Sequence, residues 1–172
     1  MPDLPHIRPM QEADLAAVLA IQARCYAGDI PESAQAFLSK LQASPATCFV
    51  ATRGQQLAGY LLALPVTPPD LPALDARHYR VPEQPDCLYL HDLAVDPAAR
   101  SQGTGQRLIG QFWTTARQLA LPRTLLIAIQ GSAPFWARHG FCPEPATSAA
   151  LYQKLASYGA GAQLMGACPL PD

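Results

Sequence analysis

The sequence predicts an α/β fold with a mixed sheet, and three observations predict it. Of its 172 residues, 49% are hydrophobic and 15% are charged, which suits a folded domain with its own core. Runs rich in β-branched and aromatic residues alternate with stretches of helical apolar periodicity. No repeat or linker divides the chain, so residues 1–172 are expected to form a single domain.

The N-terminal part is expected to form a strand followed by two helices. Residues 6–10, "HIRPM", predict a short strand. A helix with one buried, mostly apolar face follows from the spacing of Leu15, Val18, Leu19, Gln22, Cys25 and Tyr26. Pro31 is expected to open the second helix and Pro45 to end it.

The middle of the chain predicts a hairpin and then a long loop. Residues 47–64 hold two β-rich runs around a turn at Gly54, and Gly59 indicates a bulge or a close backbone approach. The next segment, residues 65–86, cannot hold a central strand because it carries Pro65, Pro68, Pro69, Pro72, Pro82 and Pro85.

The C-terminal half predicts a parallel crossover. Residues 86–96, "DCLYLHDLAVD", predict a buried strand, and alternation places on one of its faces Tyr89, His91, Leu93 and Val95. A strong amphipathic helix follows, and then the apolar run "TLLIAI" at residues 124–129. Strand, helix and strand in this order favour a parallel pair. A short helix that ends near Gly140 is expected in "APFWARHGF", and strands after it, with residues 161–167 as the last.

Composition argues against several classes of protein. The formal net charge is −1, without the basic excess of a nucleic-acid-binding surface. No apolar run is long enough for a bilayer, and "MPDLPHIRPM" lacks the order of a signal peptide, so a cytoplasmic protein without a membrane partner is expected. Five scattered cysteines match neither a zinc site nor a redox dithiol, so no metal is expected and the thiols are expected to be reduced.

Residues 95–110, "VDPAARSQGTGQRLIG", have the composition of a phosphate-binding turn. Unpaired amides at a helix start carry partial positive charge, and glycines let a ligand approach the backbone closely. Arg100 adds a fixed charge that can contact two oxygens. The pattern Arg100-x-x-Gly103-x-Gly105 is neither a Walker A loop nor a dinucleotide fingerprint, and it suits a diphosphate.

This turn resembles the acetyl-coenzyme A motif of the GNAT N-acetyltransferase superfamily. "IRPM" with two helices, "LAVDPAARSQGTGQRLI" and "APFWARHGF" follow one another in the superfamily's order. The resemblance covers nearly the whole chain. It implies a mixed, mostly antiparallel sheet of about seven strands, splayed at a central parallel pair and flanked by about four helices.

The resemblance also implies an acyl donor, acetyl-coenzyme A, and the residues that bind it. Backbone at Leu93, Ala94 and Val95 would face the pantetheine arm, and the Val95 N–H would polarise the acetyl carbonyl. The pyrophosphate would lie on the amides of Arg100, Ser101, Gln102, Gly103, Thr104, Gly105 and Gln106. The later motif would contribute Ser132, Phe135 and Trp136.

The segment "LHDLAV" is similar to the central strand of arylalkylamine N-acetyltransferases, the serotonin-acetylating branch. Two histidines of that branch are thought to remove the amine's proton through water. His91 matches the second, and Tyr89 stands at the first. A group titrating near 6.5 can accept a proton from an ammonium with a pKa of about 10.4. His91 could instead be a core histidine bonded to a backbone carbonyl, and Tyr89 a core side chain.

One departure concerns the acid that protonates the leaving thiolate. The superfamily's usual tyrosine is replaced by Trp136, whose indole is not an acid; Tyr152 and Tyr158 are candidate substitutes. Acidic residues in the proline-rich stretch, namely Asp70, Asp75, Glu83 and Asp86, would attract a cationic amine or simply be solvated.

The expected function is direct acetyl transfer from acetyl-coenzyme A to the primary amine of a small molecule in a ternary complex. Two alternatives stay open. One is a non-catalytic acyl-coenzyme A-binding regulatory domain on the same fold, which Trp136 favours. The other is transfer of a different acyl group. Many members of the superfamily are dimers, so a homodimer is also open.

Overall fold

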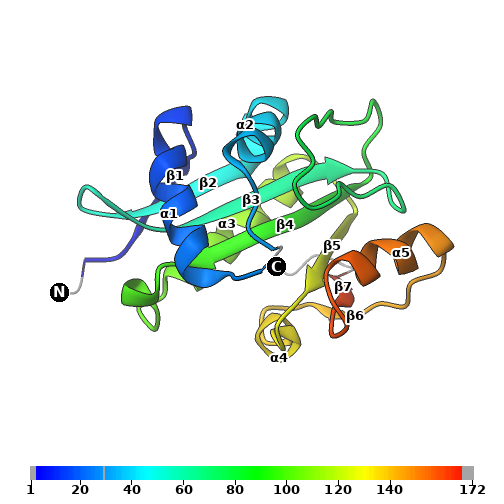
Figure 1. The fold of residues 1–172 in the computed structure, drawn as a ribbon. Coiled ribbons are helices and arrows are strands. Elements are labelled where there is room, and N and C mark those ends of the chain that lie inside the picture. Colours follow the sequence, from blue (N-terminus) through cyan, green and yellow to red (C-terminus); the bar gives the residue numbers. More distant parts are fainter. Residues whose placement is uncertain (1–2, 29, 168–172) are drawn as a thin grey trace.

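The computed structural model describes residues 3–28 and 30–167, which contain a seven-stranded mixed sheet (Figure 1). The strand order is β1-β2-β3-β4-β5-β7-β6. Only β4 and β5 pair in parallel; the other five neighbouring pairs are antiparallel. The strands are β1 (His6–Pro9), β2 (Cys48–Arg53), β3 (Gln56–Val66), β4 (Cys87–Val95), β5 (Arg123–Ala128), β6 (Cys142–Pro143) and β7 (Gln163–Ala167).

Helices cover both faces of this sheet. They are α1 (Leu15–Cys25), α2 (Ala34–Ala43), α3 (Thr104–Gln118), α4 (Ala133–Ala137) and α5 (Ala149–Ser157). Helices α1 and α2 pack on one face, and α3 packs on the other (Figure 1). The predicted fold class is therefore confirmed, including the parallel pair at the centre of the sheet.

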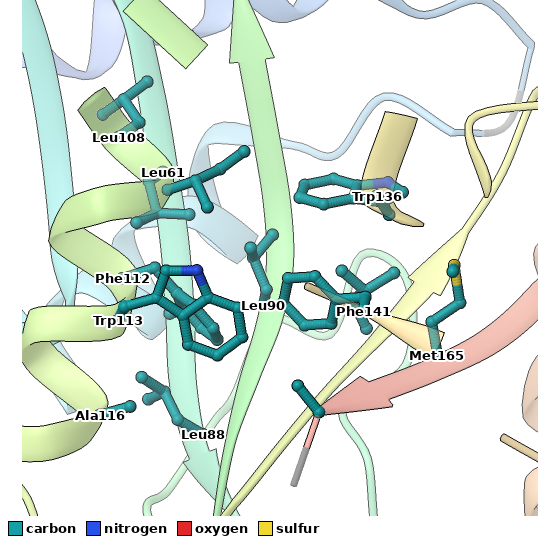
Figure 2. Packing of buried hydrophobic residues seen from close by; sticks show 14 of the residues in the cluster. Leu61, Leu88, Leu90, Leu108, Phe112, Trp113, Ala116, Trp136, Phe141 and Met165 are labelled. Carbon is teal, nitrogen blue, oxygen red and sulfur yellow. The ribbon is translucent and has the colours of Figure 1, made fainter. Parts of the chain in front are cut away.

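The core on the α3 face explains the strength of that helix's sequence pattern. Residues at helical spacing on α3 meet alternate residues of β3 and β4, as Figure 2 shows. The cluster includes Leu61, Leu88, Leu90, Leu108, Phe112, Trp113 and Phe141, of which Trp113 and Phe141 stack with ring centroids 4.9 Å apart. Burial of such side chains contributes about 1.5–3 kcal/mol each, so this layer fixes β4 against α3.

Two helices differ from expectation, and a serine hydroxyl caps the start of each. Helix α2 begins after Ser33, whose side chain accepts a hydrogen bond from the Ala36 amide, and not at Pro31. Helix α5 was not expected at all; Ser148 accepts a hydrogen bond from the Leu151 amide at its start. The described residues thus form five α-helices where about four were predicted. A serine followed by residues of good helix propensity is the signal for both starts.

The alternation expected for β4 is correct for Tyr89 and His91 but wrong beyond His91. Leu62 pairs with Asp92 and Ala63 with Leu90, so His91 is the extra residue of a β-bulge. A bulge shifts the period of two by one residue. His91 consequently lies on the α1–α2 face with Tyr89, whose ring centroid is 5.7 Å from its own, whereas Leu93 packs on the α3 face.

No helix among the described residues is both long and apolar enough to cross a bilayer. Cys25, Cys48, Cys87 and Cys142 are free thiols, and Cys168 lies outside the described residues.

Candidate active site

The candidate site begins where β4 and β5 separate. Their parallel register runs from Cys87 opposite Arg123 to Leu90 opposite Leu126, and the rest of β4 pairs, within the described residues, with β3 alone. The Asp96 amide bonds to the Ala58 carbonyl of β3. Because successive amides of a strand point in opposite directions, the Val95 N–H points away from β3, toward the opening.

A cavity of about 420 Å³ fills this opening. Among the predicted site residues, those that line it are His91, Leu93, Ala94, Val95, Arg100, Ser132, Phe135 and Trp136. Residues from α1, the loop before α2, and the segment after α5 complete its wall, among them Tyr26, Glu32 and Tyr158. The structure therefore brings the end of β4 together with the later motif, as the sequence predicts.

Arg100 lines the cavity, whereas residues 101–106 of the predicted phosphate turn do not. Gly103, with φ +80°, is the N-cap of α3 and provides no side-chain cap. The side of Gly105 that a Cβ would occupy lies 3.6 Å from Val95 Cγ2 and 3.9 Å from the Phe135 ring. The start of α3 thus contacts two cavity-lining residues, and its first amides, which have no partner within the helix, lie at the cavity's edge.

Arg100 lies at the same edge. Its Nε is 3.4 Å from the Val95 carbonyl oxygen, and its Nη2 is 3.6 Å from Cys25 Sγ. Cys25 in turn donates its thiol proton to the Val95 carbonyl at 3.3 Å. These contacts place a permanent positive charge next to the Val95 backbone.

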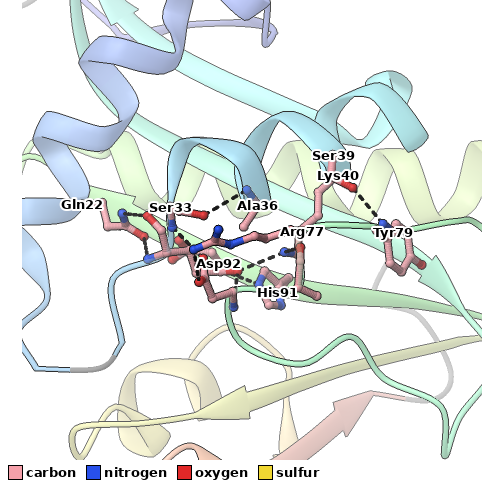
Figure 3. Close-up of polar contacts among 12 residues, drawn as sticks. Gln22, Ser33, Ala36, Ser39, Lys40, Arg77, Tyr79, His91 and Asp92 are labelled. Carbon is pink, nitrogen blue, oxygen red and sulfur yellow. Dashed lines mark hydrogen bonds and ion pairs between the residues drawn. The ribbon is translucent and has the colours of Figure 1, made fainter.

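Glu32 holds His91, which belongs to the group of polar contacts that Figure 3 shows around Ser33, Lys40 and His91. Its Oε1 is 2.5 Å from His91 Nε2, and its Oε2 accepts hydrogen bonds from Lys40 Nζ at 2.9 Å and the Asp75 amide at 2.9 Å. The side chains of His91 and Lys40 are fully buried, and that of Glu32 is 3% exposed. This network ties β4 to α2 and to the proline-rich loop.

The charge state of Glu32 determines which nitrogen of His91 carries the proton. Burial raises the pKa of Glu32, but the adjacent His91 and Lys40 together lower it by a larger amount, so that the pKa falls to about 2. The carboxylate is therefore ionised at neutral pH, and His91 Nε2 donates its proton to it. In neutral His91, Nδ1 is then the free acceptor. This atom is buried and has no hydrogen-bond partner among the described residues.

Asp92, also on the cavity wall, lies between two tyrosines. Its Oδ2 accepts a hydrogen bond from Tyr60 at 2.7 Å, and its Oδ1 is 3.0 Å from the Tyr26 hydroxyl, which also lies 2.9 Å from the Leu93 carbonyl. Burial raises the pKa of Asp92 to about 6, although the hydrogen bonds from Tyr60 and Tyr26 oppose the shift.

Sequence reasoning missed both carboxylates of the cavity. The acidic residues it named in residues 65–86 do not line this cavity; Asp75 instead accepts a hydrogen bond from the Ser33 amide at 2.8 Å. Asp92 stood beside His91 in the quoted strand, but alternation placed the two on opposite faces. Glu32 follows Pro31 just before a helix, which gave no sign of contact with β4.

The tyrosines considered as acids or water ligands differ in their exposure and in their position relative to the cavity. Tyr152 is 64% exposed and does not line the cavity. Tyr89 is fully buried behind the cavity wall, and its hydroxyl lies 3.3 Å from that of Tyr158, which lines the cavity. Trp136 lines the cavity and packs edge-on against Phe135 and Phe141. The catalytic assignments of His91, Tyr89 and Val95 stay predictions.

Comparison with known families decides the identity of this fold. The sequence model of the acetyltransferase (GNAT) family matches residues 15–141, from α1 to the segment after α4. The chain belongs to the acetyltransferase (GNAT) family. No curated protein sequence matches this GNAT chain significantly.

Solved structures share the GNAT fold at low sequence identity. The GphF GNAT-like decarboxylase in complex with isobutyryl-CoA matches with a TM-score of 0.76 and 20% identity, covering 95% of this chain and 98% of that one. The loading GNATL domain of CurA from Lyngbya majuscula matches with a TM-score of 0.76 and 13% identity, covering 95% of this chain and 97% of that one. The ribosomal-protein-S18-alanine N-acetyltransferase from Escherichia coli matches with a TM-score of 0.67 and 18% identity, covering 98% of this chain and 96% of that one. These likenesses concern the fold alone.

The ionisable residues that line this cavity include Glu32, His91 and Asp92, and histidine and carboxylate side chains are common general acids and bases. No cluster of three or more metal-ligating side chains occurs among the residues that the structure describes.

Proposed function

We propose that this GNAT protein transfers the acetyl group of acetyl-coenzyme A to the primary amine of a small molecule, by direct attack in a ternary complex. One observation carries the proposal. Where β4 no longer pairs with β5, Val95 and His91 both line one cavity, and the buried Nδ1 of His91 has no hydrogen-bond partner among the described residues. An acyl transfer to an amine needs both an oxyanion donor and a proton acceptor.

The donor half of the site supports coenzyme A binding. The pantetheine arm would lie along Leu93–Val95, with the thioester carbonyl at the Val95 N–H. The pyrophosphate would bind the amides of residues 100–106, in the turn before α3 and at the start of that helix, where the helix dipole favours an anion. Arg100 would add its charge beside the same strand end. A donor held in this way has its developing oxyanion stabilised by a fixed amide.

The acceptor half supports removal of the amine's proton. An alkylammonium with a pKa of about 10.4 is not a nucleophile at neutral pH until it loses a proton. Nδ1 of His91 would accept that proton, directly or through a water, while Glu32 stabilises the imidazolium that forms. Attack then forms the C–N bond, the tetrahedral intermediate collapses, and the C–S bond breaks.

The leaving thiolate needs modest help, because an alkyl thiol has a pKa of about 8.5. Of the two tyrosines considered as substitutes for the missing acid, Tyr158 lines the cavity, and burial raises its pKa above the usual value. It would donate a hydrogen bond to the sulfur, and water would supply the proton.

The first test measures coenzyme A release from acetyl-CoA with a panel of primary amines, with isobutyryl-CoA as an alternative donor. Release that depends on an amine and on acetyl-CoA supports the proposal. Tight coenzyme A binding without release for any amine would favour the regulatory alternative, and a preference for isobutyryl-CoA would favour another acyl group.

His91→Gln tests the acceptor half. The variant should lower kcat/KM at neutral pH by about 10²–10⁴-fold, and by less near pH 9, where more of the amine is already neutral. A pH–rate profile parallel to that of the parent protein would contradict the role of His91.

Arg100→Ala tests the donor half by calorimetry with coenzyme A. Loss of a charge-assisted contact should weaken binding by about 1.5–3 kcal/mol. The matched control is Arg117→Ala on the far part of α3, which should bind coenzyme A as the parent does. Equal affinities of both variants would remove Arg100 from the site.

A further inference from the structure

We propose that Asp92 is the counter-ion of the acceptor's ammonium group, and that the acceptor is a cationic amine with an apolar body and no carboxylate beside its amino group. This inference rests on the proposed function, since it names the substrate class of the same cavity. It depends on which charges in that cavity already have partners.

The two carboxylates on the cavity wall differ in this respect. Glu32 is neutralised by Lys40, with which it forms an ion pair of 2.9 Å, and it also holds His91. Asp92 has only the hydroxyls of Tyr26 and Tyr60, and no ion pair among the described residues includes it. The cavity therefore contains one carboxylate without a cation.

A buried carboxylate without a cation is costly, because neutral donors replace only part of its hydration. The raised pKa of Asp92, about 6, expresses this cost. Asp92 is nevertheless ionised above that pH, when an alkylamine is still protonated. An ammonium group that enters the cavity would supply the missing charge.

An independent observation points to the same ligand. His91 Nδ1 is a buried atom without a hydrogen-bond partner among the described residues, and His91, the neighbour of Asp92 along β4, is one of the residues that line the cavity. A primary ammonium has three N–H donors. Asp92 and His91 Nδ1 are two acceptors that such a group would satisfy, and His91 is also the residue that would then take its proton.

The cations of the site explain why a carboxylate beside the amine would be rejected. Lys40 is fully buried and already bonded to Glu32 and to the Ala76 carbonyl at 3.1 Å. Arg100 contacts the Val95 carbonyl at the donor end. The carboxylate of an α-amino acid would thus lie near Asp92 without a cation of its own, and like charges at close range disfavour binding. The neighbouring wall is apolar, with Ile30, Leu74 and Ile127.

The experiment measures ligand binding by calorimetry to the protein saturated with coenzyme A, at about pH 8, where Asp92 is ionised and the amine is a cation. The probes are two matched pairs: pentylamine with norleucine, and 2-phenylethylamine with phenylalanine. Within each pair the amine should bind at least about tenfold more tightly. Equal or tighter binding of the amino acids, or no binding of either amine, would overturn the proposal.

Two variants separate charge from structure. Asp92→Asn removes the charge and should weaken amine binding at least about tenfold, with coenzyme A affinity retained as evidence of folding. Tyr60→Phe removes a hydrogen bond to Asp92 but keeps its charge, so amine binding should be no weaker than in the parent. Unchanged binding in Asp92→Asn, or equal losses in both variants, would show that Asp92 serves only the structure.

A separate measurement tests the proposed function. Coenzyme A release from acetyl-CoA in parallel samples reports acetyl transfer, whereas the calorimetry uses coenzyme A without an acetyl group. Amine binding that depends on Asp92, without any release, would uphold the counter-ion and refute the transferase.

Discussion

Asp92 combines a position on the cavity wall with a charge that the fold does not neutralise. Its pKa rises from 3.8 to about 6 on folding. A group whose pKa is raised by folding contributes stability that is present below its unfolded pKa and lost as the pH rises through its folded pKa. The parent protein therefore loses stability between about pH 4 and 6 through this one residue.

Asp92→Asn should consequently stabilise the protein while weakening amine binding. The expected gain is about 1–3 kcal/mol at pH 8, shrinking toward zero near pH 4, where the parent carboxyl is also neutral. Urea denaturation of both proteins across this pH range measures it. A gain that stays constant with pH, or a loss at pH 8, would contradict an unpaired charge at Asp92.

Glu32 and Lys40 make the opposite case, because each neutralises the other inside the protein. Glu32→Gln leaves Lys40 buried without a counter-ion and should cost about 3–5 kcal/mol of unfolding free energy at neutral pH. The double variant Glu32→Gln with Lys40→Met should be less destabilised than the sum of the single variants. Additive losses in denaturant titrations would show that the two charges are not coupled.

At the residue scale, the sequence identified His91 but not what holds it. The motif around "LHDLAV" was enough to select His91 and Val95, and both line the cavity. Glu32 lies 59 residues away in the sequence and meets His91 only because the loop before α2 folds over β4. Such long-range contacts have no periodic signature in one sequence.

Between elements, the approach of β3 to β4 is close enough to exclude a side chain. A Cβ at Gly59 would lie 2.8 Å from the Ala94 carbonyl and 3.3 Å from side chains of Leu108 and Thr104 on α3. The close backbone approach expected at Gly59 is thus confirmed, and it lies opposite Val95 in the register.

Gly59→Ala should push the end of β4 away from β3 and misplace the Val95 amide. We expect a loss of about 1–3 kcal/mol in stability together with a higher KM for acetyl-CoA. Gly110→Ala on α3, where a Cβ would meet nothing within 4 Å, is the matched control; it should leave the KM unchanged and raise stability by about 0.5–1 kcal/mol, because alanine favours a helix more than glycine does. Thermal melting and steady-state kinetics test the pair; equal behaviour of the two variants would refute the strand-end argument.

Strand and helix periodicity predicted these elements well where they are long. The parallel crossover β4–α3–β5 follows from an apolar strand, a helix with a regular stripe and a second apolar run. The bulge at His91 was not predictable, because neither glycine nor proline marks it and its register depends on the pairing with β3. Helix α5 was missed because its apolar face is narrow, with Leu151 as its one buried residue.

Over the whole molecule, the cavity exists because two central strands stop pairing after Leu90 and Leu126. The order of elements predicts which strands are parallel, but the point at which they separate depends on packing from both faces. On one face, the α3 core fixes β4; on the other, the Glu32 network holds the loop before α2 against it. The site thus joins segments from most of the chain.

A crystal structure of the protein with acetyl-coenzyme A tests the central claim most directly. We predict that the acetyl carbonyl oxygen lies within hydrogen-bond distance of the Val95 N–H and that the pyrophosphate contacts the amides of residues 100–106. A nucleotide bound elsewhere, or a thioester that does not reach the opening between β4 and β5, would contradict it.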